Sequence, residues 1–310
     1  MLKVTLTFED GKKAVFTRPL RLRLESAAEA PADILTVVLA AEGTVPPVGM
    51  AEVYDREECV FRGPADVQTE ELSERGTLLT VTARSMASVL LDSEARPQVY
   101  CMPSMSLLME RHFIPLGFKE YTGDDLVFTG ELNISKGMSE WSVLKTFCES
   151  AGAVPAVSRD GVIDITGGAA SEIFISRSRV LSVKRRLERK ALVSELYART
   201  SIGGGYDMKL ESSLADRHGV KRTRFINSVE SSRRTVLTAE KLMKQADSGY
   251  ETLIIDCGGR LLCAPGDRLT LEGMSGGFRV RELMYELGAS GEHTVIRAGR
   301  ESEENKNEII

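Results

Sequence analysis

Short apolar runs with a period of two fill most of this 310-residue chain and constrain its fold more than any other feature. Near the N-terminus, Val4, Leu6 and Phe8 alternate with polar residues, and an Asp-Gly pair follows them. Such alternation buries one face of a strand, and Asp-Gly accepts the positive φ of a hairpin turn. Similar runs recur as far as residue 97, and separate strands are expected at 60–61 and 65–72, on either side of Gly63. We therefore expect 1–97 to form about six or seven short strands in a small barrel or sandwich.

The middle of the chain, 98–175, breaks this pattern. Its segment 136–165, KGMSEWSVLKTFCESAGAVPAVSRDGVIDI, holds the single tryptophan. Ser139 suits a helix N-cap, and Gly152 suits the left-handed residue that ends a helix. The period then returns to two around a second Asp-Gly pair, which predicts a hairpin. We expect a small α/β domain whose helix buries Trp141, Leu144, Phe147, Cys148 and Ala151.

Period-two alternation returns in 176–302, where Gly-rich turns separate the runs and 260–262 is expected to form one of the strands. One helix is expected to begin at Thr238, with this residue as its N-cap. The polar residues 303–310 are expected to form a flexible tail. The predicted fold is therefore mainly β with an α+β insert, in which two small β-barrel domains, 1–97 and 176–302, flank the small α/β domain 98–175.

The composition is that of a folded soluble protein, because 42% of the residues are hydrophobic and 27% are charged. The length exceeds what one core usually sustains, which agrees with more than one domain. A net charge of −5 gives no support for a specific nucleic-acid binder, whose surface is strongly basic. No apolar run suits a secretory signal or a membrane span, so the chain is expected to fold in the cytoplasm without inserting into a membrane.

The cysteines do not predict a metal site. None forms a Cys-x-x-Cys pair, and the three histidines, His112, His218 and His293, lie far from any cysteine pair in the sequence. A zinc site needs several converging ligands of this kind. We expect no metal and no cofactor, and we expect buried free thiols in a reducing compartment. The cysteines are Cys59, Cys101, Cys148, Cys257 and Cys263.

His112 lies on a second predicted helix, beside Phe113. A catalytic role would require a nucleophile or a carboxylate placed near it, and no sequence motif provides one. The alternative, a partly buried histidine with a structural role, is favoured.

A basic cluster occupies 177–190 and raises the question of nucleic-acid binding. Val180, Val183 and Leu187 lie between its charges in the pattern of a strand, and no aromatic residues alternate with the basic ones as stacking platforms would. A strand with a charged outer face is therefore favoured.

The triplet Gly203-Gly204-Gly205 suggests a phosphate-binding loop only weakly. It lacks a following lysine with Ser or Thr, and a strand follows it where a phosphate-binding loop would begin a helix. A flexible hairpin tip is the favoured interpretation.

Motifs for the common catalytic sites are missing from the sequence, including GxSxG, HExxH, the Walker sequence and the dinucleotide fingerprint. Ser135, Ser139 and Ser142 surround the predicted helix, but no motif links them to a histidine. The sequence therefore predicts no catalytic, cofactor-binding or metal-binding residue, and a protein that is not an enzyme.

Three stretches resemble the late control D family, the central hub proteins of phage tail baseplates that also occur in contractile bacteriocins and defective prophages. The first is 61–91, FRGPADVQTEELSERGTLLTVTARSMASVLL, with its FxG and its "ARS" entry into a helix. The others are the segment KGMSEWSVLKTFCESAGAVPAVSRDGVI and the segment 265–280, PGDRLTLEGMSGGFRV. None of the three is a catalytic motif.

The resemblance implies a structural part of a phage or phage-tail-like particle. Such hubs form homotrimers in which two barrel domains per chain give six similar units, so that a sixfold tail tube can meet a threefold spike. The implied partners are the tail tube or distal tube protein, the spike protein and other baseplate proteins, with DNA passing through the lumen. The implied location is the bacterial cytoplasm during assembly and then the particle. Two alternatives stay open, a baseplate enzyme that degrades cell-wall polymer and a soluble binding module.

Overall fold

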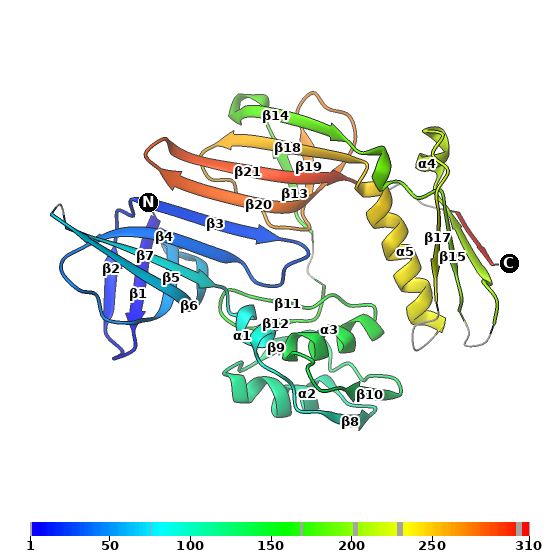
Figure 1. Ribbon diagram of the computed structural model, residues 1–310, viewed down its shortest axis with the longest axis horizontal. Helices are drawn as coiled ribbons and strands as arrows, with labels where there is room; N and C mark the ends of the chain where they lie inside the picture. Colours follow the sequence, from blue (N-terminus) through cyan, green and yellow to red (C-terminus); the bar gives the residue numbers. More distant parts are fainter. Residues whose placement is uncertain are drawn as a thin grey trace. The chain divides into compact units, whose positions relative to one another are not determined.

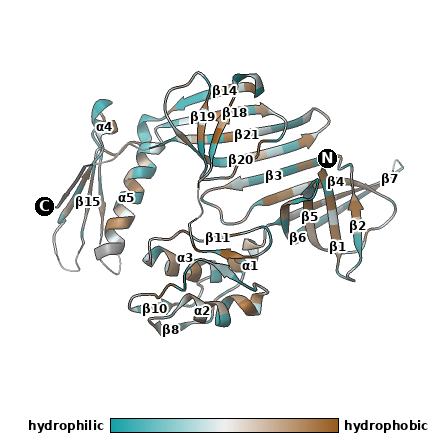
Figure 2. Cartoon of the chain, turned by 180° about the vertical axis from the view of Figure 1, so that it is seen from behind, coloured by the Kyte–Doolittle hydropathy of each residue, from teal (hydrophilic) through white to brown (hydrophobic). Residues whose placement is uncertain are grey.

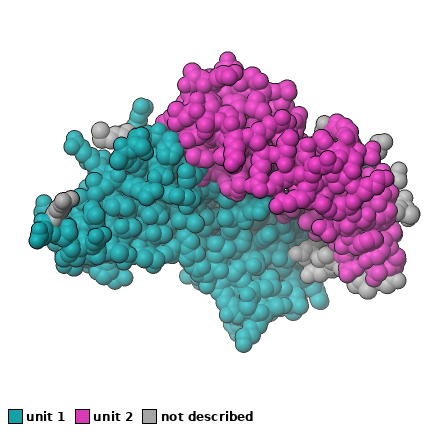
Figure 3. Space-filling model, turned by 45° about the horizontal axis from the view of Figure 1, so that its top comes forward, with its two compact units in different colours: residues 1–169, 284–293 teal, residues 170–283, 294–310 magenta. Residues whose placement is uncertain are grey.

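The chain forms two compact units in the computed structural model (Figure 3). Unit 1 comprises 1–169 with 284–293, and unit 2 comprises 170–283 with 294–310. The structure is mainly β, as predicted, and most of its strands belong to antiparallel sheets. The structure describes residues 2–74, 76–167, 170–200, 204–227, 232–301 and 306–309.

Seven antiparallel strands form the first part of unit 1 (Figure 1). Their order in the sheet is β2-β1-β5-β6-β7-β4-β3, and β20 follows β3. Apolar and polar residues alternate along the strands (Figure 2), as expected for one buried and one solvated face. The strands are β1 (Leu2–Phe8), β2 (Lys13–Phe16), β3 (Arg21–Ala27), β4 (Ile34–Ala41), β5 (Val48–Asp55), β6 (Glu58–Ser73) and β7 (Gly76–Arg84).

Strand β6 turns the corner of this sheet. The sequence predicts two strands around Gly63, but the structure shows one strand of 16 residues, which pairs with β5 as far as Pro64 and then with β7. A Cβ atom on Gly63 would lie 1.8 Å from the backbone oxygen of Arg84, so only glycine fits where β6 passes the end of β7. The FxG motif is therefore a packing requirement of this corner.

Both halves of the folded sheet bury side chains in one core. β1 contributes Val4 and Leu6, β4 contributes Val37, and β7 contributes Leu79 and Val81, all of them fully buried. The sequence predicts this segment as a barrel or sandwich. Strands β2 and β3, at the two ends of this strand order, do not pair with each other among the described residues.

The second part of unit 1 mixes short helices and strands around a separate core. That core includes Phe113, Phe118, Leu144 and Phe147. The elements are α1 (Ala87–Asp92), β8 (Gln98–Cys101), α2 (Met105–Leu108), the π-helix η1 (Met109–Phe113), the 3₁₀-helix η2 (Ile114–Leu116), β9 (Tyr121–Thr122), β10 (Glu131–Ile134), α3 (Glu140–Ser150), β11 (Ala156–Val157) and β12 (Ile163–Asp164).

The predicted helix-to-hairpin segment is confirmed. The Ser139 side chain accepts a hydrogen bond from the backbone N–H of Ser142 at 3.2 Å, and Gly152 has a φ of 75°. Strands β11 and β12 pair antiparallel around Gly161, whose φ is 80°.

The predicted buried face of α3 is partly wrong. Leu144, Phe147 and Cys148 are buried as expected, but Trp141 is only half-buried at the edge of the core and Ala151 is exposed. The buried stripe is rotated toward Glu140 and Val143 because α3 packs against α1 on that side.

Six strands of unit 2 are hydrogen-bonded in the order β14-β18-β21-β20-β19-β13. The strands are β13 (Glu172–Ile175), β14 (Val180–Leu187), β18 (Glu251–Gly258), β19 (Arg268–Leu271), β20 (Phe278–Gly288) and β21 (Gly291–Arg300), and the tip of the β20–β21 hairpin belongs to unit 1. Because β13 pairs with β19, the end of the segment predicted as the α/β domain belongs to unit 2. Residues 260–262, predicted as a strand, are irregular.

A separate layer of unit 2 consists of a four-stranded sheet and a long helix. The sequence did not predict it as a distinct layer. The strands are β15 (Glu195–Ala198), β16 (Met208–Glu211), β17 (Thr223–Ile226) and β22 (Lys306–Ile309), and the helices are α4 (Ser213–Arg217) and α5 (Ser232–Ser248).

The predicted start of helix α5 is wrong. The helix begins at Ser232, so Thr238 lies inside it. Val236, which precedes the predicted start, packs against the core of this layer. Strand β22 occupies part of the segment predicted as a flexible tail and pairs with β16. Gly203 of the glycine triplet lies outside the described residues.

Candidate functional site

The histidine expected to be structural lies in a buried hydrogen-bonded cluster. His112 Nδ1 is 2.9 Å from Glu140 Oε2, and its Nε2 is 3.0 Å from the Tyr100 hydroxyl. Because a carboxylate only accepts, Nδ1 donates to Glu140 and Nε2 can accept from the hydroxyl. His112 is 3% exposed and Glu140 is 7% exposed. The cluster therefore ties together η1, α3 and β8 inside the core.

Sequence reasoning missed the partner of His112. Glu140 is 28 residues from His112 in the sequence and is the first residue of α3, directly after the N-cap Ser139. Acidic residues in the first turn of a helix usually face solvent, where they interact with the helix dipole. One signal was present, because Glu140, Leu144 and Phe147 fall at i, i+4 and i+7, the spacing of one helix face. A histidine beside a carboxylate can act in acid–base chemistry, but a substrate would have to reach it, and this pair is enclosed by the core.

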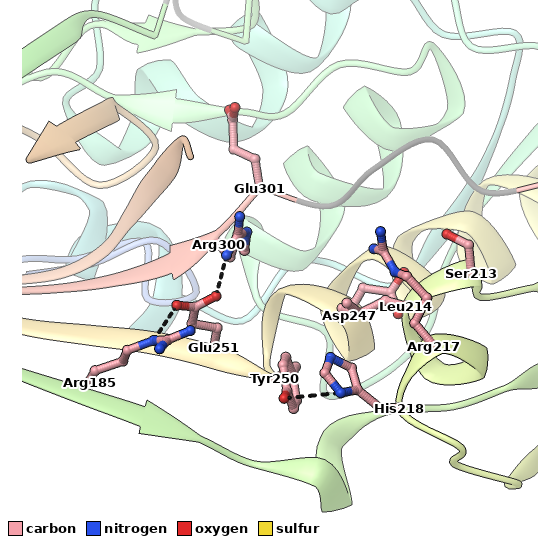
Figure 4. Close-up of a pocket in the computed structure, with 10 residues that line it drawn as sticks. All are labelled: Arg185, Ser213, Leu214, Arg217, His218, Asp247, Tyr250, Glu251, Arg300 and Glu301. Carbon is pink, nitrogen blue, oxygen red and sulfur yellow. Dashed lines mark hydrogen bonds and ion pairs between the residues drawn. The ribbon is translucent and has the colours of Figure 1, made fainter. Parts of the chain in front are cut away.

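A polar pocket lies in unit 2, beside α4, the end of α5 and the start of β18, and has a volume of about 280 Å³. Glu251 accepts from Arg185 Nε and from Arg300 Nη1, both at 2.6 Å (Figure 4). The rings of Tyr250 and His218 pack against each other at a centroid distance of 4.4 Å, with their planes tilted by 37°. The remaining lining residues are Ser213, Leu214, Arg217, Asp247 and Glu301.

Opposing effects act on the Glu251 carboxyl. Burial raises its pKa, but the hydrogen bonds and charges of Arg300 and Arg185 outweigh burial and hold the pKa below its ordinary value. Each guanidinium uses one N–H on this carboxylate and has others to offer. Three arginines and three carboxylates line the pocket, so its formal charges balance. Of the hydroxyl groups in the pocket, that of Tyr250 lies 3.4 Å from Nδ1 of His218, a long contact for a hydrogen bond.

The basic cluster forms strand β14, as predicted, but its apolar side chains are not buried. Leu181 is 67% exposed, Val183 is 41% exposed and Leu187 is 48% exposed. β14 is at the end of its sheet, so among the described residues its outer backbone edge pairs with no strand. An edge strand that is exposed on both faces is a typical site for pairing with another chain.

The cysteines are all free thiols, and only some are buried as predicted. Cys148 and Cys257 are buried, whereas Cys101 is exposed. Burial raises the pKa of Cys148 to about 12 and that of Cys263 to about 12, which keeps these thiols protonated. Within the described ranges, no group of three His, Cys, Asp or Glu side chains could hold a metal ion, and no helix is long and apolar enough to cross a membrane.

The stretch 265–280 is a structural turn. Asp267 is buried, and its carboxylate accepts from the backbone N–H of Ala264 at 2.7 Å and of Ser171 at 2.9 Å. Gly266 has a φ of 98°, which disfavours other residues. Like the FxG corner and the capped helix α3, this motif fixes the backbone and leaves no reactive group exposed.

No family model matches this sequence, and no curated protein matches it. Solved structures do match. The 43 kDa tail protein of prophage MuSo2 from Shewanella oneidensis superposes with a TM-score of 0.80 at 14% identity, over 96% of this chain and 98% of that one. A tail protein from Neisseria meningitidis gives 0.76 at 18% identity, over 96% of both chains.

A more distant match is the E. coli protein c3393, a component of the type VI secretion system described as similar to the T4 tail proteins gp27 and gp5. It gives a TM-score of 0.54 at 11% identity, over 92% of this chain and 74% of that one. These identities are too low to carry a function across. They show that this chain has the fold of phage tail proteins along nearly its whole length.

Proposed function

We propose that this protein is a non-enzymatic part of the baseplate of a phage or phage-tail-like particle, where it forms the trimeric hub between tail tube and spike. The observation that supports this most is the likeness of fold to two tail proteins over 96% of the chain. The likeness extends over nearly the whole chain. A likeness confined to one domain would say little about function, because single domains of the same fold occur in proteins with unrelated roles.

The hub role assigns two tube-type barrel domains to the β-rich parts of units 1 and 2, and places the α/β part between them. Its partners would be the tail tube or distal tube protein, the spike protein and other baseplate proteins. The chain would assemble in the bacterial cytoplasm and remain in the particle. The exposed apolar residues of β14 fit this role, because a protein that works in a ring must present strand edges or faces to its neighbours.

A cell-wall-degrading enzyme is the alternative from another class, and the polar clusters do not favour it. The buried carboxylate of Glu140 lies in an enclosed core. The carboxylate of Glu251 is bound by two arginines, which lower its pKa. Glycoside hydrolysis needs one carboxyl group that keeps its proton near neutral pH and a second one across the scissile bond.

The test is the mass of the purified protein in solution together with its position in the particle. Sedimentation equilibrium should give three times the chain mass of 34.0 kDa. Antibodies against the protein should label the baseplate end of purified particles in electron micrographs. A protein that stays monomeric with tail proteins present, or clearing of cell-wall polymer by the pure protein in a zymogram, would overturn the proposal.

A further inference from the structure

We propose that the outer face of the four-stranded sheet in unit 2 binds the pyranose rings of an oligosaccharide. The other face of this sheet packs against α5 (Figure 1), and the residues of β15 and β16 that point toward the helix are buried: Leu196, Ala198, Met208 and Leu210. Because successive side chains of a strand point to opposite faces, the residues between them lie on the outer face. The proposed hub role does not depend on this site.

Three aromatic side chains meet on the outer face. Tyr197 of β15 and Phe225 of β17 are cross-strand partners, and their rings stack with centroids 5.5 Å apart and planes 18° apart. Tyr206, which precedes β16, meets the Phe225 ring at 5.0 Å and a tilt of 62°. Such pairs stabilise a sheet, but stability alone would favour a buried ring, and Phe225 is 62% exposed. The cluster therefore presents aromatic surface to the solvent.

Ionic contacts hold Tyr197 in place. Lys209 lies across from it in the sheet, with the ammonium group 5.6 Å from the ring centroid. Glu195 binds this ammonium at 3.0 Å, and Glu211 forms a second ion pair with it. The lysine is thus fixed beside the ring by two carboxylates.

Tyr206 is held as well. Its hydroxyl donates to Oδ1 of Asn227 at 3.2 Å, and the guanidinium carbon of Arg199 lies 5.2 Å from its ring centroid. Contacts between a cation and a ring restrict both side chains. The aromatic surface is therefore ordered before a ligand arrives, which lowers the entropic cost of binding.

The spacing of the rings decides what shape of ligand fits. The rings are in contact with one another, so they leave no groove of the kind in which proline-rich peptides bind. A folded protein partner would need a broad surface with an apolar centre. Among the described residues of this face, only Phe225 is a strongly exposed large hydrophobic side chain. The cluster therefore suits a ligand that lies flat on one ring, which means a sugar or a nucleobase.

The charge around the rings separates these two ligands. Three carboxylates balance three cations there. The carboxylates belong to Glu195, Asp207 and Glu211, and the cations belong to Arg199, Lys209 and Lys221. Single-stranded nucleic acids bind surfaces with a surplus of positive charge, because their phosphates must be neutralised. A balanced surface favours an uncharged ligand.

A pyranose ring matches both properties. One of its faces consists of C–H groups, which pack on an aromatic ring, and its rim carries hydroxyl groups that donate and accept hydrogen bonds. Thr223 and Asn227 lie two residues before and after Phe225 and are exposed. Their hydroxyl and amide groups, with the nearby carboxylate of Glu195, can pair with the sugar hydroxyls.

Ligand-observed NMR tests the platform on the full-length protein. The probes are cellotetraose, maltotetraose and tetra-N-acetylchitotetraose, with an oligothymidylate as the nucleic-acid probe. Phe225→Ala removes the exposed ring, and Phe225→Leu removes its flat surface but keeps an apolar side chain in the strand, so that one of the two can be tested if the other misfolds. Phe225→Tyr keeps the ring. The matched control is Phe174→Ala, because Phe174 also lies on a strand of unit 2 and is 65% exposed.

Saturation transfer from protein to probe reports binding, titration gives the Kd, and circular dichroism verifies folding. We expect at least one oligosaccharide to bind the wild type. Phe225→Ala and Phe225→Leu should each raise the Kd about tenfold or more, because they remove the stacking surface, whereas Phe225→Tyr and Phe174→Ala should leave it unchanged. The platform would be overturned by no transfer to any of the three sugars, by equal binding to the Ala and Leu variants, by the same loss in Phe174→Ala, or by binding of the oligothymidylate alone.

Discussion

Units 1 and 2 each bury a carboxylate against nitrogen donors, yet the two clusters differ in their access to water. Glu140 and its partner His112 are both enclosed in the core of the α/β part. Glu251 is as buried as Glu140, but the side chains of Arg185 and Arg300 that bind it are 53% and 39% exposed. The first cluster can only hold the fold together, whereas the second places polar groups where another molecule can reach them.

The comparison predicts the largest loss of stability in the enclosed cluster. Glu140→Ala should lower the free energy of unfolding by about 3 kcal/mol, because it leaves the ring nitrogen of His112 buried without its acceptor. Denaturant unfolding monitored by circular dichroism measures the loss. Glu140→Gln, which can still accept a hydrogen bond, is the control and should lose less. A loss under about 1 kcal/mol would show that water enters this core.

Trp141→Ala should cost about 2 kcal/mol. A fully buried aromatic side chain would cost about 3–5 kcal/mol, but Trp141 lies half-exposed at the edge of the same core. Phe147→Ala on the same helix is the matched reference, because Phe147 is 1% exposed, and thermal melting should rank it as the more damaging change. Equal losses in the two variants would contradict the assignment of Trp141 to the edge.

Glu251→Ala should cost only about 1 kcal/mol, although its carboxylate is buried. Without this carboxylate, the side chains of Arg185 and Arg300 can turn into the pocket and become hydrated, so no charge stays buried without a partner. The same unfolding assay measures this loss. A loss as large as that of Glu140→Ala would mean that the pocket is closed to water and would remove the difference between the two clusters.

The smallest effect is the pH dependence of that loss. The folded-state pKa of Glu251 is held below its ordinary value of 4.5, so its contribution is fully present above that value and disappears as the pH falls through the lowered folded-state pKa. The difference in unfolding free energy between wild type and Glu251→Gln should therefore be constant near neutral pH and shrink in acid. A difference that grows as the pH falls below 4.5 would contradict the sign of the shift.

The resemblance to hub proteins rested on residues that the structure now explains as backbone requirements. Gly63 permits the crossing of β6 over Arg84, Ser139 caps α3, and Asp267 fixes the turn before β19. Such positions favour few residue types, because only glycine fits beside the Arg84 backbone and short polar side chains make the best helix caps. A motif of this kind reports the fold.

Local sequence patterns were enough to predict the mainly β character, the hairpins at Asp-Gly pairs and the helix that begins after Ser139. These features follow from alternation, turn residues and caps, which act between neighbours in the chain. Contacts between distant residues emerged from the folded chain alone. Folding pairs His112 with Glu140, joins two predicted strands into β6, starts α5 before Thr238 and leaves Val183 and Leu187 of β14 exposed. Burial depends on which elements pack together, and local periodicity does not contain that information.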